Sequence, residues 1–552
     1  MSFHAGFRKP SELESSKKAQ TTMQIYVMID GNRQGPYSPE EVRQYLATGQ
    51  LQPQMLAWCE GMADWQPLGT LPDFALPAAK PGGNPGRSRT PLYASLAVGA
   101  IALCAVAGWL VWHGKQSNGS EATSGASTVA GAPDLFASHP DWPKNLAELN
   151  QWYAEPPAGQ NAAEVFRQGY NAMKEQISAK SKNANLPIVG TAAIPQPGSP
   201  VPAAMKKAIA EYMQQNKTAW DFFQQGSSLA QSRYPLDFTR ANMLLPDLAP
   251  LKQGAQAADL YALGYADTHR GKEAGESVLI GYAIGRSLEA EPTSISQLVR
   301  VACNAIMLQA LEQTVNRVAL PPESLTRLQD VLGRMADREA SGESFNRAFV
   351  GAMVDGLAWF DMSPAERKKT LDSFGTNLPN DTNDVIASLQ KNGVKNIKAE
   401  RQFFVAGWAK LFAARREPFP SRFKAGDVIG SLAEEAKTRK YLLTMLTMPA
   451  LGNVAWREAD SLARLRLAQT AVALEQFRAA GSNHYPNDLA ELSPKFLAAV
   501  PEDPFDGQPL RYAKSGNGYA LHSIGPPGAN DATLKGLSFT VFDPPKPASA
   551  AP

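Results

Sequence analysis

Residues Leu92–Trp112 read LYASLAVGAIALCAVAGWLVW, a stretch of 21 residues without a charged side chain. A helix rises about 1.5 Å per residue, so this stretch spans about 30 Å, the thickness of the hydrocarbon core of a bilayer. Its internal position distinguishes it from a cleavable signal peptide. We therefore predict one transmembrane helix over residues 91–112, with a small region before it and a large region after it.

The flanking charges predict the orientation of this helix. Lys80, Arg87 and Arg89 precede it, whereas only Lys115 follows it closely. Basic residues are enriched on the cytoplasmic side of a membrane. The sequence therefore predicts a cytoplasmic N-terminus and a C-terminal region on the far side of the bilayer.

Small residues and cysteines add two expectations about this helix. Ala100, Cys104 and Gly108 follow one another at four-residue spacing, which is typical of helix–helix contacts in membranes and predicts a possible homodimer seam. The three cysteines of the chain, Cys59, Cys104 and Cys303, fall before, inside and after the predicted span. We therefore expect no intrachain disulfide.

The region before the helix contains a small folded unit. Residues 1–22 are polar and predicted to be disordered, and Met23 is an alternative start to Met1. Residues 24–29 and 56–58 have the composition of strands. Between them, Ser38 followed by Pro39 predicts the start of a helix.

Residues 23–75 resemble the GYF-like domain of bacterial membrane proteins. The order and spacing of the matching residues carry this resemblance: Tyr26, Gly35-Pro36, Ser38-Pro39-Glu40-Glu41, Gly49, Trp58, Gly61-Met62 and Trp65. The resemblance implies a small α+β fold and the binding of a proline-rich peptide or protein. With the predicted topology, it also implies a bacterial inner (cytoplasmic) membrane protein.

Aromatic side chains would form the peptide groove of such a domain, because a polyproline helix is preformed and loses little entropy when it docks against rings. The resemblance implies a peptide-binding site made by Tyr26, Gly35, Pro36, Tyr37, Trp58 and Trp65. The alternative is that the aromatic residues fill the core of a very small domain.

The remaining boundaries follow from composition. We predict a Pro/Gly linker over 76–90, a flexible linker over 113–140, a helical domain over 141–460, a C-terminal module over 461–545 and a tail over 546–552. Apolar residues at helical spacing predict helices at about 203–225, 246–271, 274–288, 294–315, 322–338, 343–359, 398–414 and 455–480. Asn161 is placed to open another helix, and residues 186–202 form a proline-rich loop.

The C-terminal module contains a helix, a Tyr485-Pro486 turn, a short helix capped by Asn487, an Asp-Pro-Phe-Asp-Gly loop and strands. It is similar to the C-terminal part of type II secretion major pseudopilins and to modules in uncharacterised proteins of Verrucomicrobia and Planctomycetes. Pseudopilins bind calcium in the loop after the strands, so the resemblance makes Asn530 and Asp531 candidate calcium ligands. The alternative is that these residues only form a turn.

Motifs for catalysis fail on spacing. Gly264, Gly271 and Lys272 are spaced wrongly for a phosphate-binding loop, and the sequence around Ser344 lacks the second glycine of a nucleophile elbow. The six histidines show no metal-ligand spacing. Asp503 and Asp506 remain as a carboxylate pair for acid–base chemistry.

Charges exclude one class of partner and leave one pairing open. A formal net charge of +2 disfavours a nucleic-acid-binding protein. Arg300 follows Glu289 and Glu291 in the sequence, so either a partly buried ion pair or separate solvated charges are expected.

Together these features predict a multidomain chain with a small α+β GYF-like domain, one transmembrane helix, a large mostly α-helical region and a small α+β C-terminal module. We expect a membrane-anchored interaction or scaffold protein that is not an enzyme and needs no cofactor. One alternative is a structural part of a secretion or pilus-like apparatus. A second is an envelope hydrolase.

Overall fold

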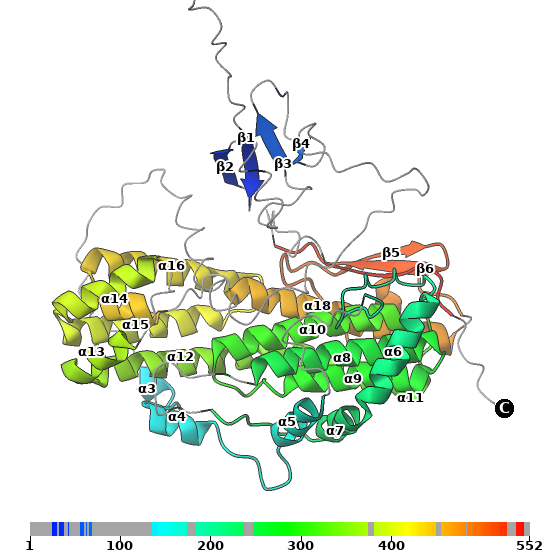
Figure 1. The fold of residues 1–552 in the computed structure, drawn as a ribbon, viewed down its shortest axis with the longest axis horizontal. Helices are drawn as coiled ribbons and strands as arrows, with labels where there is room; N and C mark the ends of the chain where they lie inside the picture. Colours follow the sequence, from blue (N-terminus) through cyan, green and yellow to red (C-terminus); the bar gives the residue numbers. More distant parts are fainter. Residues whose placement is uncertain are drawn as a thin grey trace, which may run out of the picture. The chain divides into compact units, whose positions relative to one another are not determined.

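A computed structural model gives the fold of the chain (Figure 1). It describes residues 25–29, 32–37, 42, 56–59, 62, 66–68, 135–173, 184–236, 238, 245, 247–373, 380–448, 454–481, 483–526 and 537–545. The chain divides into two compact units. The first contains the strands from β1 (Ile25–Ile29) to β4 (Gln66–Pro67), and the second contains the elements from α3 (Leu135–Ser138) to β7 (Ser538–Val541).

The first unit is an antiparallel sheet with the strand order β2-β1-β3-β4, in which β2 is Asn32–Tyr37 and β3 is Leu56–Cys59. The predicted strands at 24–29 and 56–58 are confirmed as β1 and β3, whereas β2 and β4 were not predicted. Ile25, Ala57 and Leu68 are fully buried, which gives this small sheet an apolar face. The predicted helix at Ser38 lies outside the described residues except for Val42, which is helical and buried.

The second unit is mainly helical. Its helices are α3, α4 (Leu146–Trp152), α5 (Ala162–Ala172), α6 (Ala203–Gln215), α7 (Lys217–Ser227), α8 (Leu248–Asp267), α9 (Gly271–Arg286), α10 (Ser294–Val315), α11 (Pro322–Ser341), α12 (Glu343–Asp361), α13 (Pro364–Asp372), α14 (Asn380–Asn392), α15 (Ile397–Arg415), α16 (Lys424–Arg439), α17 (Leu442–Thr447) and α18 (Val454–Ala480), with 3-10 turns at η2 (Ser421–Phe423) and η4 (Leu489–Leu492). A large helical region was predicted, and the structure confirms it.

Most predicted helices are confirmed with ends that differ by a few residues. Seven of them correspond to α8, α9, α10, α11, α12, α15 and α18. The eighth prediction, a single helix over 203–225, is wrong because the chain leaves helical geometry at Asn216 and forms α6 and α7. Asn161 opens α5 as predicted, since its side chain accepts a hydrogen bond from the backbone of Ala163. The loop at 186–202 contains no helix or strand.

The largest hydrophobic cluster of the described residues lies among α8, α9, α10, α11 and α18. Leu260, Ile280, Met307 and Leu467 are fully buried there. In the part of the chain that the structure describes, α10 is the one helix long and apolar enough to cross a membrane, and 61% of its most apolar window is buried. That burial is what a core helix of a folded domain requires.

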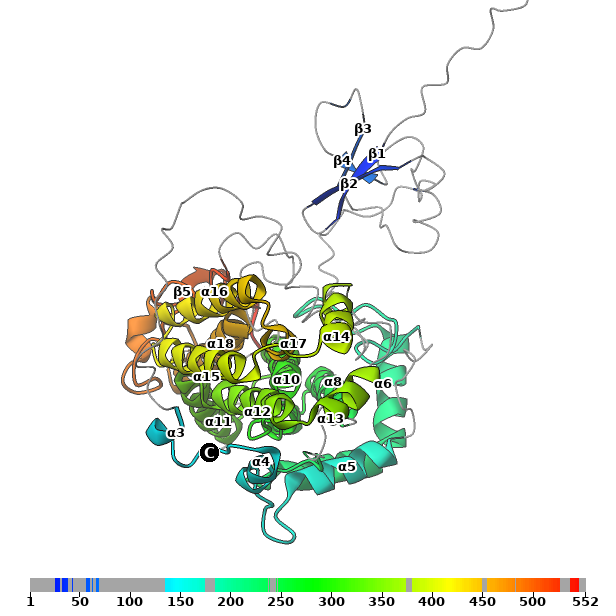
Figure 2. The ribbon, with the colours of Figure 1, turned by 90° about the vertical axis from the view of Figure 1, so that its left-hand side faces the viewer.

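The second hydrophobic cluster is centred on α12, α15 and α17. Figure 2 shows α15 and α16 side by side, with α12 next to α15. Val354, Trp408 and Leu443 are fully buried in this cluster. Large aromatic rings dominate its core, with Trp408 close to Phe404 and Phe349.

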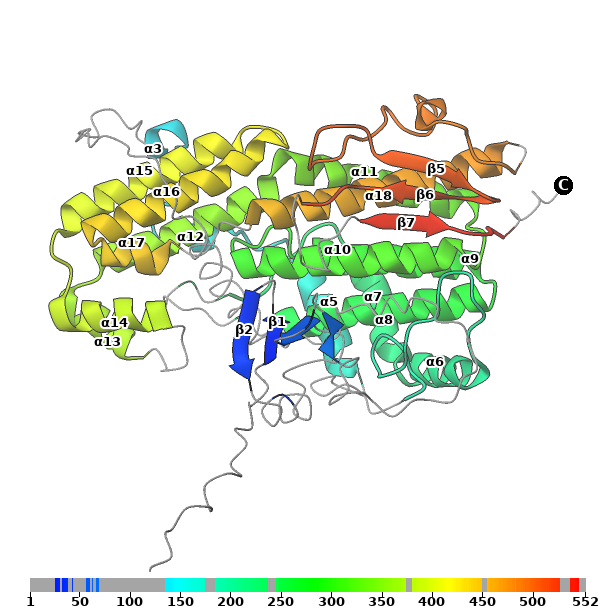
Figure 3. The ribbon, with the colours of Figure 1, turned by 90° about the horizontal axis from the view of Figure 1, so that it is seen from above.

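The C-terminal residues form an antiparallel sheet with the order β5-β6-β7, in which β5 is Arg511–Ser515 and β6 is Gly518–His522. Figure 3 shows this sheet alongside α18 and α10. The Asn316 side chain bonds the backbone of Thr540 and Phe542 at 2.8 and 3.0 Å, which satisfies the outer edge of β7. The largest hydrophobic cluster contains residues of α10, α18 and β5–β7. The predicted boundary between the helical domain and the C-terminal module, at residues 460 and 461, falls inside α18.

Two sequence predictions in this unit are wrong. Asp488, not Asn487, caps the short helix, because Asp488 and Glu491 form a reciprocal capping box. Arg300 pairs with neither Glu289 nor Glu291. It is 2% exposed and lies 2.5 Å from Glu339, which comes from the next helix along the chain.

The predicted transmembrane helix at 91–112 lies outside the described residues, together with Ala100, Cys104 and Gly108 of the proposed seam. The linkers at 76–90 and most of 113–140 lie outside them as well. Of the described cysteines, Cys59 and Cys303 are both free thiols.

Candidate peptide-binding site

The pairing of β1 with β3 brings two predicted site residues together. Tyr26 lies directly opposite Trp58, between the pairs Ile25–Cys59 and Val27–Ala57. Ile25 and Ala57 are fully buried, whereas Tyr26 and Trp58 are half-buried. Because successive side chains of a strand point to opposite faces, Tyr26 and Trp58 share the face opposite the buried residues.

The two rings are in contact range and one is fixed in place. Their centroids are 6.1 Å apart with an interplanar angle of 43°, which is within the range for favourable aromatic pairs. The indole Nε1 of Trp58 donates a 2.9 Å hydrogen bond to the backbone oxygen of Met62. The indole is therefore held against the turn that follows β3, and its N–H group is already hydrogen-bonded within the domain.

Gly35 and Pro36 lie opposite Tyr26 on the other side of β1. Ile25 pairs with Tyr37 and Val27 pairs with Gln34, so two residues of β2 face a single residue of β1. This is a β-bulge, a position that tolerates a proline because the ladder hydrogen bond is already interrupted. Backbone register thus places the Gly35-Pro36 bulge and Trp58 on the two sides of Tyr26.

The other predicted site residues are less well placed. Tyr37 ends β2 opposite Ile25, whereas Trp65 lies outside the described residues. The calcium candidates Asn530 and Asp531 also lie outside them. Within the described ranges, no group of three His, Cys, Asp or Glu side chains is arranged to hold a metal ion.

Sequence reasoning missed the role of Met62 in the site. The Gly61-Met62 pair matched the family pattern, but only the structure shows that the Met62 carbonyl anchors the Trp58 indole. The Gly61-Met62 turn shortly after Trp58 was the available signal.

The carboxylates Asp503 and Asp506 are engaged in structural hydrogen bonds. Asp503 is fully buried and accepts hydrogen bonds from the Ser523 hydroxyl, the Ile524 backbone and the Arg511 guanidinium at 3.0, 2.8 and 2.8 Å. The hydrogen bond from Arg511 lowers the pKa of Asp506. These hydrogen bonds join the loop to Arg511 of β5 and to the residues that follow β6.

Comparison with known proteins identifies the first unit. No curated protein and no solved structure matches the chain. Residues 26–74 match the family described as GYF domain 2, and the matched segment contains Tyr26, the Gly35-Pro36 bulge and Trp58. The N-terminal unit of this chain is therefore a GYF-like domain, as its sequence predicted.

Proposed function

We propose that the protein is a membrane-anchored interaction protein whose GYF-like domain binds a proline-rich peptide on the cytoplasmic side. The observation that carries the proposal is the match of residues 26–74 to a GYF domain, together with the Tyr26–Trp58 ring pair in that segment. Aromatic rings held at fixed spacing suit a polyproline helix, because its pyrrolidine rings pack on them without prior ordering.

The membrane anchor in this proposal is residues 92–112. Its support is the uncharged length of the segment and the basic residues before it. The apolar helix α10 is a poor alternative, since it lies in the core among α8, α9 and α18. In the proposed arrangement the helical unit occupies the extracytoplasmic side and serves as a scaffold.

Peptide binding is testable with the full chain purified in detergent and a fluorescent decaproline peptide as the probe. Fluorescence anisotropy should show saturable binding by the unmodified chain and none of a Gly/Ser peptide of equal length. Truncation of an aromatic hot-spot residue costs about 2 kcal/mol or more, so Tyr26→Ala should weaken binding by about thirtyfold or more.

Two matched variants separate recognition from folding. Tyr26→Phe keeps the ring beside Trp58 and should retain most of the affinity. Gln66→Ala changes an exposed residue of β4 in the same sheet and should leave affinity unchanged. Failure of decaproline to bind the unmodified chain, or equal affinity of the Tyr26→Ala variant, would overturn the proposal.

A further inference from the structure

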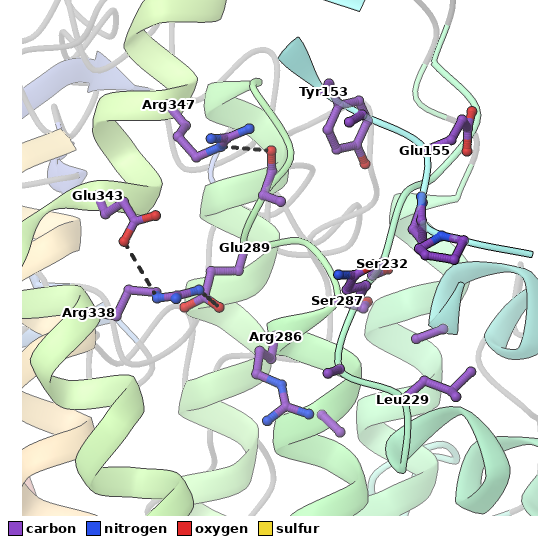
Figure 4. A pocket seen from close by; sticks show the side chains of 18 of the residues that line it. Tyr153, Glu155, Leu229, Ser232, Arg286, Ser287, Glu289, Arg338, Glu343 and Arg347 are labelled. Atoms are coloured by element: carbon purple, nitrogen blue, oxygen red, sulfur yellow. Dashed lines mark hydrogen bonds and ion pairs between the residues drawn. The ribbon is translucent and has the colours of Figure 1, made fainter. Parts of the chain in front are cut away.

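A cavity of about 460 Å³ lies in the helical unit, at the C-terminal end of α9. Its walls come from residues 152–157, residues 229–232, the last turn of α9 with the residues after it, and the facing ends of α11 and α12 (Figure 4). The volume is within the range of small-molecule binding sites. The GYF match covers residues 26–74 and therefore none of the residues that line this cavity.

The carboxylates that line the cavity already have arginine partners. Glu289 lies 2.9 Å from Arg338, and Glu343 lies 3.6 Å from the same guanidinium. Glu155 pairs with Arg233 at 2.9 Å. Each glutamate of the lining is therefore paired with an arginine, and Glu289 and Glu343 share Arg338.

Arg347 is fixed without a carboxylate partner. Its Nε donates a 3.2 Å hydrogen bond to the Ala290 carbonyl, and its guanidinium carbon lies 3.9 Å from the centre of the Trp152 ring. Stacking of this kind orients a guanidinium while leaving its other N–H groups available. Burial lowers the pKa of Arg347, which reflects the cost of keeping this charge partly out of water.

Arg286 is the arginine of the lining with neither a hydrogen bond nor an ion pair among the described residues. It is only partly exposed. Figure 4 shows its side chain directed away from the Arg338–Glu289 pair. Burial lowers the pKa of Arg286, and an anion at this guanidinium would offset that cost.

A second donor and an apolar wall complete the site. Ser232 lines the cavity, and its buried hydroxyl has no hydrogen-bond partner among the described residues. Pro156, Pro157 and Leu229 supply apolar surface in the same cavity. Three arginines and three glutamates line the cavity, and of these described arginines only Arg338 makes ion pairs with the glutamates.

We propose that this cavity binds a small organic anion, whose carboxylate or phosphate group pairs with Arg286 and whose apolar part packs against the proline-rich wall. A guanidinium binds either group through two parallel N–H donors, and both groups share this oxyanion chemistry. Arg347 and the Ser232 hydroxyl provide further donors at the same cavity. The site is independent of peptide binding by the GYF-like domain.

Isothermal titration calorimetry of the full chain in detergent tests the proposal, with succinate and inorganic phosphate as separate probes and succinamide as the neutral counterpart. At least one anion should bind with a Kd of about 1 mM or below. Succinamide should not bind. The anion that binds tells whether the site prefers a carboxylate or a phosphate.

Two variants at opposite ends of α9 assign the binding to the cavity. Arg286→Gln should weaken the binding at least tenfold, whereas Arg270→Gln should not change it, because Arg270 is exposed and pairs with Glu273 at the start of the helix. The proposal is overturned if neither anion binds the unmodified chain, or if Arg286→Gln binds as tightly as the unmodified chain does.

A measurement without a variant gives a second, independent reading. Phenylglyoxal modifies accessible arginines, and a bound oxyanion shields the guanidinium that it contacts. Peptide mass spectrometry should show that the better probe protects Arg286 and leaves Arg270 equally modified. Equal modification of Arg286 with and without the probe would contradict the proposed site even if the Arg286→Gln variant failed to fold.

Discussion

Glu458 on α18 holds two arginines in the interior of the helical unit. Its carboxylate lies 3.0 Å from Arg415 of α15 and 2.8 Å from Arg422 of η2. The three side chains are at most 3% exposed. Such a group ties separate segments together, because each charge depends on the others for compensation after losing its water.

Glu458→Gln should therefore destabilise the protein by about 3–5 kcal/mol, because it leaves two buried guanidinium groups without a countercharge. Urea unfolding followed by helical circular dichroism measures the loss. Glu435→Gln, which breaks the exposed pair between Glu435 and Arg439, should change stability by less than about 1 kcal/mol. Equal effects of the two variants would show that the buried group adds nothing.

Asp259 on α8 predicts a dependence of stability on pH. It is 2% exposed, and burial raises its pKa to about 8. Between the ordinary carboxyl pKa and pH 8, the folded chain holds a proton that the unfolded chain releases, so this residue makes stability fall as pH rises. Its contribution is most favourable in acid, below the unfolded pKa.

Asp259→Asn should remove this dependence. The variant should be more stable than the unmodified chain at pH 8, and the difference should shrink towards pH 5 by at most about 1.4 kcal/mol per pH unit. Thermal unfolding across this pH range measures the difference. Asp330→Asn on the exposed face of α11 is the control, and a pH-independent difference for Asp259→Asn would refute the assignment.

The placement of individual residues was predictable from the sequence where it depends on motif spacing within a short segment. The family spacing pointed to Tyr26 and Trp58, and the strand register brings these two together. Arg300 was not predictable, because its partner Glu339 is 39 residues away and the two meet only when α10 packs against α11. Arg286 was missed for the same reason, since its cavity is built by segments that lie far apart in the sequence, between residues 152 and 347.

At the scale of elements, some helix positions must be glycine because a neighbouring segment packs too closely for a side chain. A Cβ on Gly351 of α12 would lie 1.9 Å from the Pro292 carbonyl oxygen, so the helix can approach that segment only without a side chain. Gly430 of α16 has nothing within 4 Å of such a Cβ. The same substitution should therefore have opposite effects at the two positions.

Gly351→Ala should destabilise the protein by about 1–3 kcal/mol through this clash. Gly430→Ala should stabilise it by up to about 1 kcal/mol, because alanine loses less backbone entropy in a helix. Midpoints of thermal unfolding for the two variants test both signs. A stabilising effect of Gly351→Ala would mean that α12 and the Pro292 segment are not packed as described.

Helices with strong periodicity and clear breaks were predicted well. Thr293 caps α10 and Gly342 ends α11 in a left-handed conformation, and both ends lie near the predicted ones. Helices such as α16 and α14 were not predicted, since their apolar stripes are short and polar residues surround them. The break at Asn216 was missed because nothing nearby contains proline or glycine.

At the scale of the whole molecule, the small sheet unit and the large helical unit have separate cores. Ile25, Ala57 and Leu68 belong to the first, whereas the two large clusters belong wholly to the second. Two units with independent cores can occupy different compartments without either losing its packing. This independence is what the proposed arrangement across a membrane requires.

The proposed topology predicts opposite protease sensitivity on the two sides of a bacterial inner membrane. In inside-out vesicles, trypsin should cut at Arg87 or Arg89 in the linker and release the GYF-like domain, while the helical unit inside the vesicle stays intact. In spheroplasts the linker should be protected, since the enzyme reaches only the outer face.

Detergent should remove the protection in both preparations, which serves as the control for sealed membranes. Immunoblots with antibodies against each unit follow the fragments, and resistance to alkaline carbonate extraction tests for a spanning helix. Cleavage of the linker in spheroplasts would reverse the orientation, and release of the uncut chain by carbonate would exclude residues 92–112 as a transmembrane anchor.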